Sequence, residues 1–141
     1  IRSQDWVNII HLTDSGTVIM IRQFRHGVNE ITLEIPGGIV DPGEDPLQAA
    51  MRECREETGF AGVGMAELIG VNDPNPAIQD NRCYSYLWHG CKPVTAQFLD
   101  EHEDIEVVEV PLDQVQHLVR NGSIRHSLVL TALFFYFTKI A

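Results

Sequence analysis

The chain has 141 residues, 44% of them hydrophobic and 21% charged, a composition that suits one globular domain with its own core. Its 20 acidic residues outnumber 10 Lys and Arg, and the net charge of −10 disfavours binding to the phosphate backbone of nucleic acid. No apolar run is long enough to predict a membrane span. We therefore expect a single domain over residues 1–141 with neither nucleic acid nor membrane as partner. Because the first residue is Ile1 rather than Met, the sequence leaves room for a preceding N-terminal extension.

Strand and turn signals alternate at the start of the chain. Residues 6–13 and 17–24 are rich in β-formers and are separated by Asp14-Ser15-Gly16, so we expect them to form a hairpin. Residues 31–35 alternate apolar and polar side chains and lead into Pro36-Gly37-Gly38, where we expect a turn.

The next element is a helix with a defined beginning and end. Asp45 is a favoured N-cap, Pro46 suits the first helical position, and Gln48 completes a D-x-x-Q variant of the capping box. Gly59 is a natural C-terminal stop. These signals predict a helix over Pro46–Thr58.

The rest of the chain predicts further strands followed by two helices. We expect strands at residues 63–71, 83–90 and 105–110, a polar loop at 72–81, and helices at 112–120 and 123–138, the last capped by Ser123. This order predicts an α/β fold with a mixed β-sheet between helical layers.

The three cysteines indicate free thiols. Cys54, Cys83 and Cys91 are an odd set without CxxC spacing, which is typical of a reducing compartment and predicts a cytoplasmic protein. A zinc site of Cys83, His89 and Cys91 is an alternative, although alternation along one strand explains their spacing more simply.

The predicted helix carries a cluster of acids. Glu53 and Glu57 are four residues apart and share one face, with Glu56 beside them. Three carboxylates this close repel one another, and Arg52 and Arg55 offset only part of the charge. An oxygen-preferring cation, Mg²⁺ or Mn²⁺, would stabilise the cluster. A solvated acidic face is the alternative interpretation.

The segment before the helix favours a metal site, because a glycine-rich loop leaves carbonyl groups free as further ligands. Residues 38–60 read GIVDPGEDPLQAAMRECREETGF and resemble the Nudix box, a pattern of Gly, five residues, Glu, seven residues and REUxEExGU with U aliphatic. Cys54 and Phe60 stand at the two aliphatic positions. The positions in register are Gly38, Glu44, Arg52, Glu53, Glu56, Glu57 and Gly59.

The resemblance implies a Nudix-type α/β/α sandwich and a divalent-metal-dependent pyrophosphohydrolase. It implies that Glu53 and Glu57 are the primary metal ligands, that Glu56 is a further ligand with a part in catalysis, and that the Gly37 carbonyl contributes. Arg52 and Glu44 resemble the pair that ties the loop to the helix. The box positions with structural roles are Gly38, Glu44, Arg52 and Gly59.

The flanking segments resemble the ADP-ribose and nucleotide-sugar pyrophosphatase branch of the family. They are RQFRH at 22–26, LEIPGG at 33–38, Pro76, and GSIRHSL at 122–128. In that branch the catalytic base is often a glutamate in an acidic loop before the last strand, which implies Glu101 first and Glu103 second. A mobile acidic loop without a catalytic role is the alternative.

Three arginines are candidates for contacts with the substrate's phosphate or ribose, and surface ion pairing is the equal alternative for each: Arg22, Arg25 and Arg82. Stacking on a base is one interpretation of Trp6, Phe24, Tyr84 and Trp88, and a place in the core is the alternative that their predicted strands favour. The histidines, His11 and His126 among them, are assigned structural roles.

The sequence thus predicts Mg²⁺-dependent hydrolysis of ADP-ribose or a related nucleoside diphosphate sugar into a nucleoside monophosphate and a sugar phosphate. The branch resemblance also implies a homodimer. One alternative is the same chemistry on nucleoside triphosphates or dinucleoside polyphosphates. The other is a nucleotide-sensing module that does not cut, which the intact set of box acids disfavours.

Overall fold

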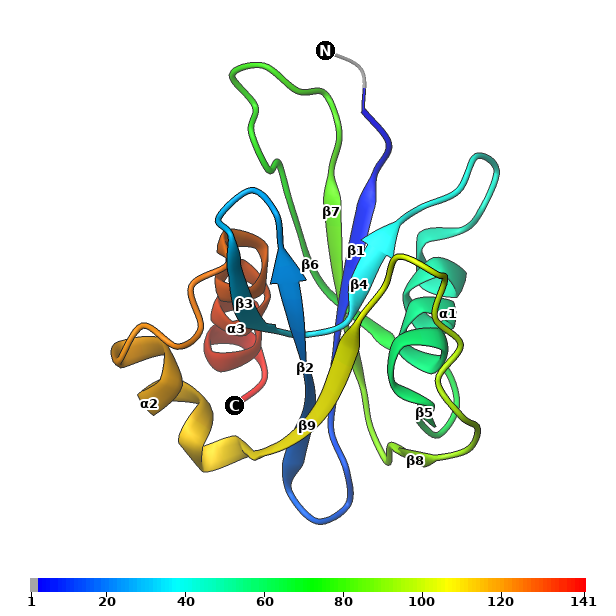
Figure 1. The fold of residues 1–141 in the computed structure, drawn as a ribbon, viewed down its shortest axis with the longest axis vertical. Helices are drawn as coiled ribbons and strands as arrows, with labels where there is room; N and C mark the ends of the chain where they lie inside the picture. Colours follow the sequence, from blue (N-terminus) through cyan, green and yellow to red (C-terminus); the bar gives the residue numbers. More distant parts are fainter. Residues whose placement is uncertain (1–2) are drawn as a thin grey trace.

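The computed structural model describes residues 3–141 and divides them into short strands and three α-helices (Figure 1). The strands are β1 (Trp6–His11), β2 (Thr17–Arg25), β3 (Glu30–Glu34), β4 (Gly37–Ile39), β5 (Phe60–Ala61), β6 (Glu67–Asn72), β7 (Cys83–Trp88), β8 (Lys92–Pro93) and β9 (Ile105–Pro111). The helices are α1 (Pro46–Thr58), the 3₁₀ turn η1 (Leu112–Gln114), α2 (Val115–Arg120) and α3 (Ser127–Lys139).

The strands form two main sheets rather than one. The first has the order β4-β1-β7-β6 and is mixed, because β1 runs parallel to β7 while its other pairs are antiparallel. The second has the order β3-β2-β9 and is antiparallel throughout, and β5 and β8 form a small third ribbon. The expected hairpin of β1 and β2 is wrong: the two strands belong to different sheets and are joined only by the single bridge between Leu12 and Val18.

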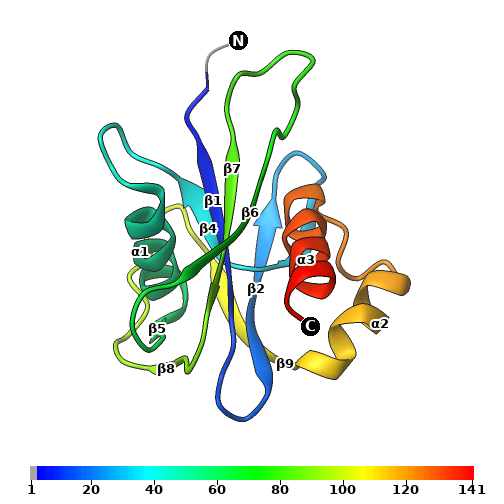
Figure 2. The ribbon, with the colours of Figure 1, turned by 180° about the vertical axis from the view of Figure 1, so that it is seen from behind.

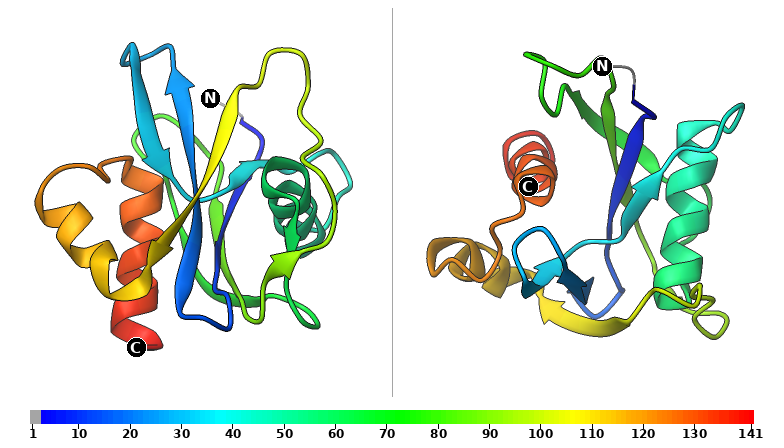
Figure 3. Two further views of the ribbon diagram at one scale, coloured as in Figure 1. Left: turned by 60° about the horizontal axis from the view of Figure 1, so that its bottom comes forward. Right: turned by 45° about the horizontal axis from the view of Figure 1, so that its top comes forward.

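Helices cover the mixed sheet from both sides. Figures 2 and 3 place α1 on one side of β1 and β4, with α3 and α2 on the other. The side chains of β1 alternate accordingly, since Val7 and Ile9 join the core beneath α1 whereas Ile10 joins the core beneath α3. The expectation of an α/β fold with a mixed sheet between helical layers is confirmed.

The local signals of α1 have their expected effect. The Asp45 side chain accepts a hydrogen bond from the amide of Leu47 at 3.4 Å, and Pro46 occupies the first turn. Gly59 ends the helix with φ of 76°, a left-handed conformation that glycine adopts without strain, and its amide donates to the Arg55 carbonyl at 2.8 Å. The expected bounds, Pro46–Thr58, are confirmed.

Several other expected elements differ from the structure, among them the strand expected at residues 63–71, which is β6 over Glu67–Asn72, and the helix expected at 112–120, which is η1 followed by α2. Gly37 and Gly38 lie in strand β4 rather than in a turn, because both pair with β1. The two backbones are so close that a Cβ on Gly37 would stand 2.4 Å from the Val7 carbonyl oxygen. Helix α3 begins at Ser127 rather than near Ser123. Its N-cap is His126, whose Nδ1 accepts a hydrogen bond from the Leu128 amide at 3.2 Å.

Within residues 3–141, no helix combines the length and the apolar character needed to cross a membrane. All three cysteines, Cys54, Cys83 and Cys91, are buried and free. Among these same residues no three His, Cys, Asp or Glu side chains are placed so that protein ligands alone could hold a metal ion, neither Cys83, His89 and Cys91 nor the three box glutamates.

Candidate active site

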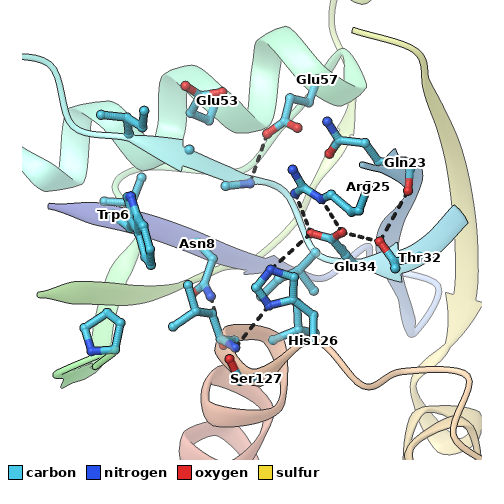
Figure 4. Close-up of a pocket in the computed structure, with 18 of the residues that line it drawn as sticks. Trp6, Asn8, Gln23, Arg25, Thr32, Glu34, Glu53, Glu57, His126 and Ser127 are labelled. Atoms are coloured by element: carbon cyan, nitrogen blue, oxygen red, sulfur yellow. Dashed lines mark hydrogen bonds and ion pairs between the residues drawn. The ribbon is translucent and has the colours of Figure 1, made fainter. Parts of the chain in front are cut away.

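A cavity of about 1070 Å³ opens where the two sheets, α1 and the start of α3 meet. Figure 4 shows Glu53 and Glu57 reaching into it from α1, with Trp6 and Arg25 at opposite sides and His126 across from the glutamates. The lining comes from segments far apart in the sequence. The lining residues are contributed by the segments around residues 6–8, 23–28, 32–41, 52–57, 74–79 and 125–129 and by Asp100 and Glu103.

Strand β4 fixes the position of Glu57. The backbone amide of Gly37 donates a hydrogen bond of 2.9 Å to Oε1 of Glu57, which reaches β4 from helix α1. Glu57 is buried, with only 3% of its surface exposed. Glu53 lies against Gly38, where a Cβ would stand 2.5 Å from Glu53 Oε1. The two box glycines thus allow the two carboxylates to sit directly over β4.

The surroundings of these two acids disfavour their charged forms. Burial, followed by the charge of Glu53, raises the pKa of Glu57 to about 9. Burial likewise raises the pKa of Glu53 to about 7, although Arg52 acts in the opposite direction. A cation bound between them would stabilise both groups as carboxylates, because it offsets the cost of two negative charges in a poorly solvated site.

Arg52 gathers the other acids of the box. Its guanidinium donates to Glu44 through two bonds of 2.9 and 3.1 Å, which ties the loop before α1 to the helix. It also contacts Glu53 and Glu56, each at 3.1 Å. The structure therefore gathers Glu44, Glu53 and Glu56 around the guanidinium of Arg52.

A second network fixes Arg25. Its guanidinium forms two hydrogen bonds of 2.7 Å with the buried carboxylate of Glu34. Burial alone would raise the pKa of Glu34, but hydrogen bonds from Arg25 and Thr32 outweigh it and hold that pKa below its ordinary value. His126 Nε2 lies 3.9 Å from Glu34, which links the start of α3 to the same carboxylate.

The acidic loop before β9 brings one of its two candidate bases to the cavity. Glu103 lines the cavity and accepts a hydrogen bond from the Asp100 amide at 3.1 Å. Glu101 lies outside the cavity lining, with 84% of its side chain exposed and its carboxylate 3.3 Å from His102.

The three candidate arginines also separate. Arg25 lines the cavity, whereas Arg22 and Arg82 are not part of its lining. Arg22 pairs with Glu106 at 3.3 Å in an exposed ion pair on the surface of the β3-β2-β9 sheet. The backbone amide of Arg82 donates to the side chain of Asp5 at 2.8 Å.

Sequence reasoning did not assign Trp6, Asn8 or His126 to the site, although all three line the cavity. Trp6 lies at the start of β1 with its indole partly exposed to the cavity, and not in the core. Asn8 is buried beside it, accepts a hydrogen bond from Ser85, and donates to the Leu128 carbonyl at 3.0 Å. His126 caps α3. Two signals were present: base stacking was an open interpretation of Trp6, and the GSIRHSL segment around His126 is one of the flanks that resemble the nucleotide-sugar branch.

Comparisons with known proteins agree with this geometry. The NUDIX domain model matches residues 3–132. The methanol dehydrogenase activator of Bacillus methanolicus is 31% identical over 134 residues, which are 94% of this chain and 72% of that protein. The ADP-ribose pyrophosphatase of Bacillus subtilis (strain 168) is 31% identical over 119 residues, which are 84% of this chain and 64% of that protein. A crystal structure of an ADP compounds hydrolase superposes with a TM-score of 0.85 at 24% identity, covering 96% of this chain and 71% of that one.

The family model and the related ADP-ribose pyrophosphatase indicate a pyrophosphohydrolase, and the solved structure shows the same α/β/α sandwich fold. The chain belongs to the NUDIX domain family, and the sequence prediction of that family and enzyme class is confirmed.

Proposed function

We propose that this protein hydrolyses the pyrophosphate bond of ADP-ribose or a related nucleoside diphosphate sugar, releasing a nucleoside monophosphate and a sugar phosphate. The observation that carries the proposal is the pair Glu53 and Glu57, held over β4 at one side of a cavity of about 1070 Å³. That volume lies at the upper end for small-molecule sites and gives room for a whole nucleotide sugar. The relatedness to an ADP-ribose pyrophosphatase supports the same substrate class.

The residues present fit a divalent cation, for which we propose Mg²⁺, with Mn²⁺ able to substitute. Mg²⁺ is usually held by one or two carboxylates together with water and substrate phosphates, so a complete protein cage is not needed. Glu53 and Glu57 would hold it, with Glu56 and the Gly37 carbonyl as further ligands. The cation would neutralise the pyrophosphate, polarise the attacked phosphorus and lower the pKa of a bound water.

The chain's own residues supply positioning and proton transfer. Arg25 faces the cavity in a geometry fixed by Glu34, and we propose that it binds a substrate phosphate or ribose oxygen. Glu103 is the candidate base that reaches the cavity, so we propose it ahead of Glu101. Arg22 and Arg82 would serve the substrate only through a contact from outside this cavity, for example in a dimer.

We also propose a homodimer in the cytoplasm that acts on a small molecule and not on nucleic acid. The branch resemblance supports the dimer, the three free thiols support a reducing compartment, and the net charge of −10 opposes binding to a phosphate backbone.

The test is product release from ADP-ribose, nucleotide sugars, nucleoside triphosphates and dinucleoside polyphosphates, with Mg²⁺ or with EDTA. We expect metal-dependent cleavage of ADP-ribose or a nucleotide sugar, reduced roughly 100-fold or more in Glu57→Gln. Glu109→Gln, a matched change on β9 outside the cavity lining, should retain activity. Turnover confined to triphosphates or dinucleoside polyphosphates would contradict the substrate assignment. Nucleotide binding without any turnover would favour the sensing module.

A further inference from the structure

The two tryptophans of this chain have opposite environments. Trp88 is 3% exposed and its indole N–H donates to the Gly64 carbonyl at 3.0 Å, as expected of a core residue. Trp6 is partly exposed and lines the cavity, and within residues 3–141 its indole N–H has no hydrogen-bond partner. A large aromatic surface left open inside a cavity is available to a flat ligand group.

The backbone of β1 holds Trp6 in place. The Trp6 amide donates to the Arg82 carbonyl at 2.9 Å, and Trp6 pairs with Ile39 of β4 and Cys83 of β7. Strand alternation puts Trp6 on the same face of the sheet as Asn8, the face that α3 covers. The indole is therefore part of a rigid wall rather than of a loop.

Free carboxamides line the same cavity as this indole. Asn75 and Gln79 both line the cavity, and within the described residues neither side chain has a hydrogen-bond partner. A turn fixes their backbone, since the Asn75 carbonyl accepts hydrogen bonds from the amides of Ile78 at 3.2 Å and Gln79 at 2.9 Å. Each carboxamide offers a donor and an acceptor, the pair that a nucleobase edge requires.

Trp6 and the residue that binds Glu57 lie at nearby register positions of β1 and β4. In the pairing of β1 with β4, Trp6 is opposite Ile39, while Gly37, which binds Glu57, is opposite Asn8. Trp6 therefore lies two residues from the Glu57 contact, roughly 7 Å along the strand direction, on a neighbouring strand. Trp6 faces the α3 side of the sheet and Glu57 reaches β4 from the α1 side, but both line the same cavity, so a nucleotide that passes the edge strand β4 would contact both.

We propose that Trp6 is the stacking platform for the base of the nucleotide substrate, with Asn75 and Gln79 facing the edge of that base. This assignment rests on the proposed function, and it places the sugar phosphate toward Arg25 and His126 on the opposite side of the cavity. Stacking on an aromatic ring tolerates any base, so selectivity for one base comes from the carboxamides.

The experiment measures AMP binding in EDTA, which requires neither metal nor turnover. Because the chain has 2 tryptophans and Trp88 is buried, stacking at Trp6 should quench the intrinsic fluorescence of the wild type. Trp6→Phe should bind AMP within about 5-fold of the wild type by calorimetry but without the quench. Trp6→Ala should bind AMP roughly 10- to 100-fold more weakly, since the aromatic face is lost. Ribose 5-phosphate, which has no base, should bind all three proteins alike and cause no quench.

A separate measurement tests the contacts of Asn75 and Gln79 with the edge of the base. Gln79→Ala should reduce the ratio of AMP affinity to UMP affinity, while the quench by AMP persists because Trp6 is unchanged. Equal affinity of the wild type for AMP and UMP would overturn the assignment of Asn75 and Gln79.

Failure of the platform and failure of the proposed function remain distinguishable. If ADP-ribose is hydrolysed but AMP neither quenches the wild type nor binds Trp6→Ala more weakly, the platform is overturned and the activity stands. If AMP gives the expected quench and losses but ADP-ribose is not hydrolysed, the platform stands and the activity fails. Where both hold, Trp6→Ala should raise KM for ADP-ribose more than it lowers kcat, because the base lies away from the reacting phosphate.

Discussion

Arg25 and Glu34 join β2 to β3 through two parallel hydrogen bonds of 2.7 Å, at the edge of the cavity. Glu34 is 3% exposed, whereas 43% of the Arg25 side chain remains exposed. The buried carboxylate thus orients a guanidinium that still faces the cavity. Because Nε and Nη2 of Arg25 are bound to Glu34, the guanidinium is held in one orientation and only its remaining N–H groups are free to bind a substrate.

Removal of Arg25 should affect both stability and activity. In Arg25→Ala the buried carboxylate of Glu34 keeps only Thr32 as a neutral donor, so we expect a loss of about 2 kcal/mol in the free energy of unfolding. Water screens the exposed part of the guanidinium and keeps the loss below that of a fully buried pair. Urea unfolding measures it. Arg22→Ala removes an ion pair exposed on both sides, so its loss should stay below about 0.5 kcal/mol; equal losses in the two variants would contradict this account.

The two glycines of β4 should respond differently to alanine. In Gly37→Ala the new Cβ meets the Val7 backbone oxygen at 2.4 Å, so β4 must separate from β1 and the melting temperature should fall by several degrees. In Gly38→Ala the Cβ meets the end of the flexible Glu53 side chain at 2.5 Å, which can move aside. That variant should fold but bind Mn²⁺ more weakly by calorimetry. Gly27→Ala, where nothing lies within 4 Å, is the control for both measurements.

His11 should make stability dependent on pH. It is fully buried, neither ring nitrogen has a hydrogen-bond partner within residues 3–141, and burial lowers its pKa from 6.5 to about 3. The folded protein keeps the ring neutral while the unfolded chain takes up a proton below pH 6.5, so stability is lost as pH falls from about 6.5 toward 3. The expected contribution is about 2 kcal/mol between pH 6.5 and pH 5.

Urea unfolding of His11→Phe measures this contribution, because the variant lacks the titrating group. The difference in unfolding free energy between wild type and variant should change by that amount between the two pH values. His102→Phe changes a histidine whose side chain is 86% exposed, and it should leave the pH dependence unaltered. A pH-independent difference for His11→Phe would show that His11 is accessible to protons in the folded state.

Of the two candidate bases in the acidic loop, we expect Glu103 rather than Glu101 to be needed for catalysis. Glu103→Gln should lower kcat by roughly 100-fold or more if this carboxylate accepts the proton of the attacking water. Glu101→Gln should change kcat less than about 3-fold, since that side chain points to solvent and to His102. Steady-state rates with ADP-ribose provide the measurement, and the opposite order would return the role to Glu101.

Much of the proposed metal site could be predicted because the residues that form it lie in one continuous segment. Asp45, Pro46 and Gly59 define α1 by their immediate effects on the helix ends, and a four-residue spacing puts Glu53 and Glu57 on one face whatever the rest of the chain does. The family was recognisable for the same reason, since its pattern occupies one continuous segment.

The remainder depended on pairings between distant segments. The turn signal after residue 13 correctly indicated a reversal of the chain, but β1 pairs along its length with β7, more than 70 residues away. The alternation of β1 put Trp6 and Asn8 on one face, yet only the position of α3 decides that this face borders a cavity at Trp6. His126 was unexpected as a cap because its role requires the turn at Asn121, where Ser123 donates to Asn121 Oδ1.

The two ends of the cavity have different origins in the chain. The acids and glycines proposed for the metal lie within residues 37–57, whereas Trp6, Asn75, Gln79 and His126 come from separate strands, loops and a helix start. The reactive end can therefore be inherited as one block, while the recognition end can change by single substitutions that leave that block intact. Evolution of new substrate preferences on this scaffold, and their engineering in the laboratory, should proceed through the scattered residues first.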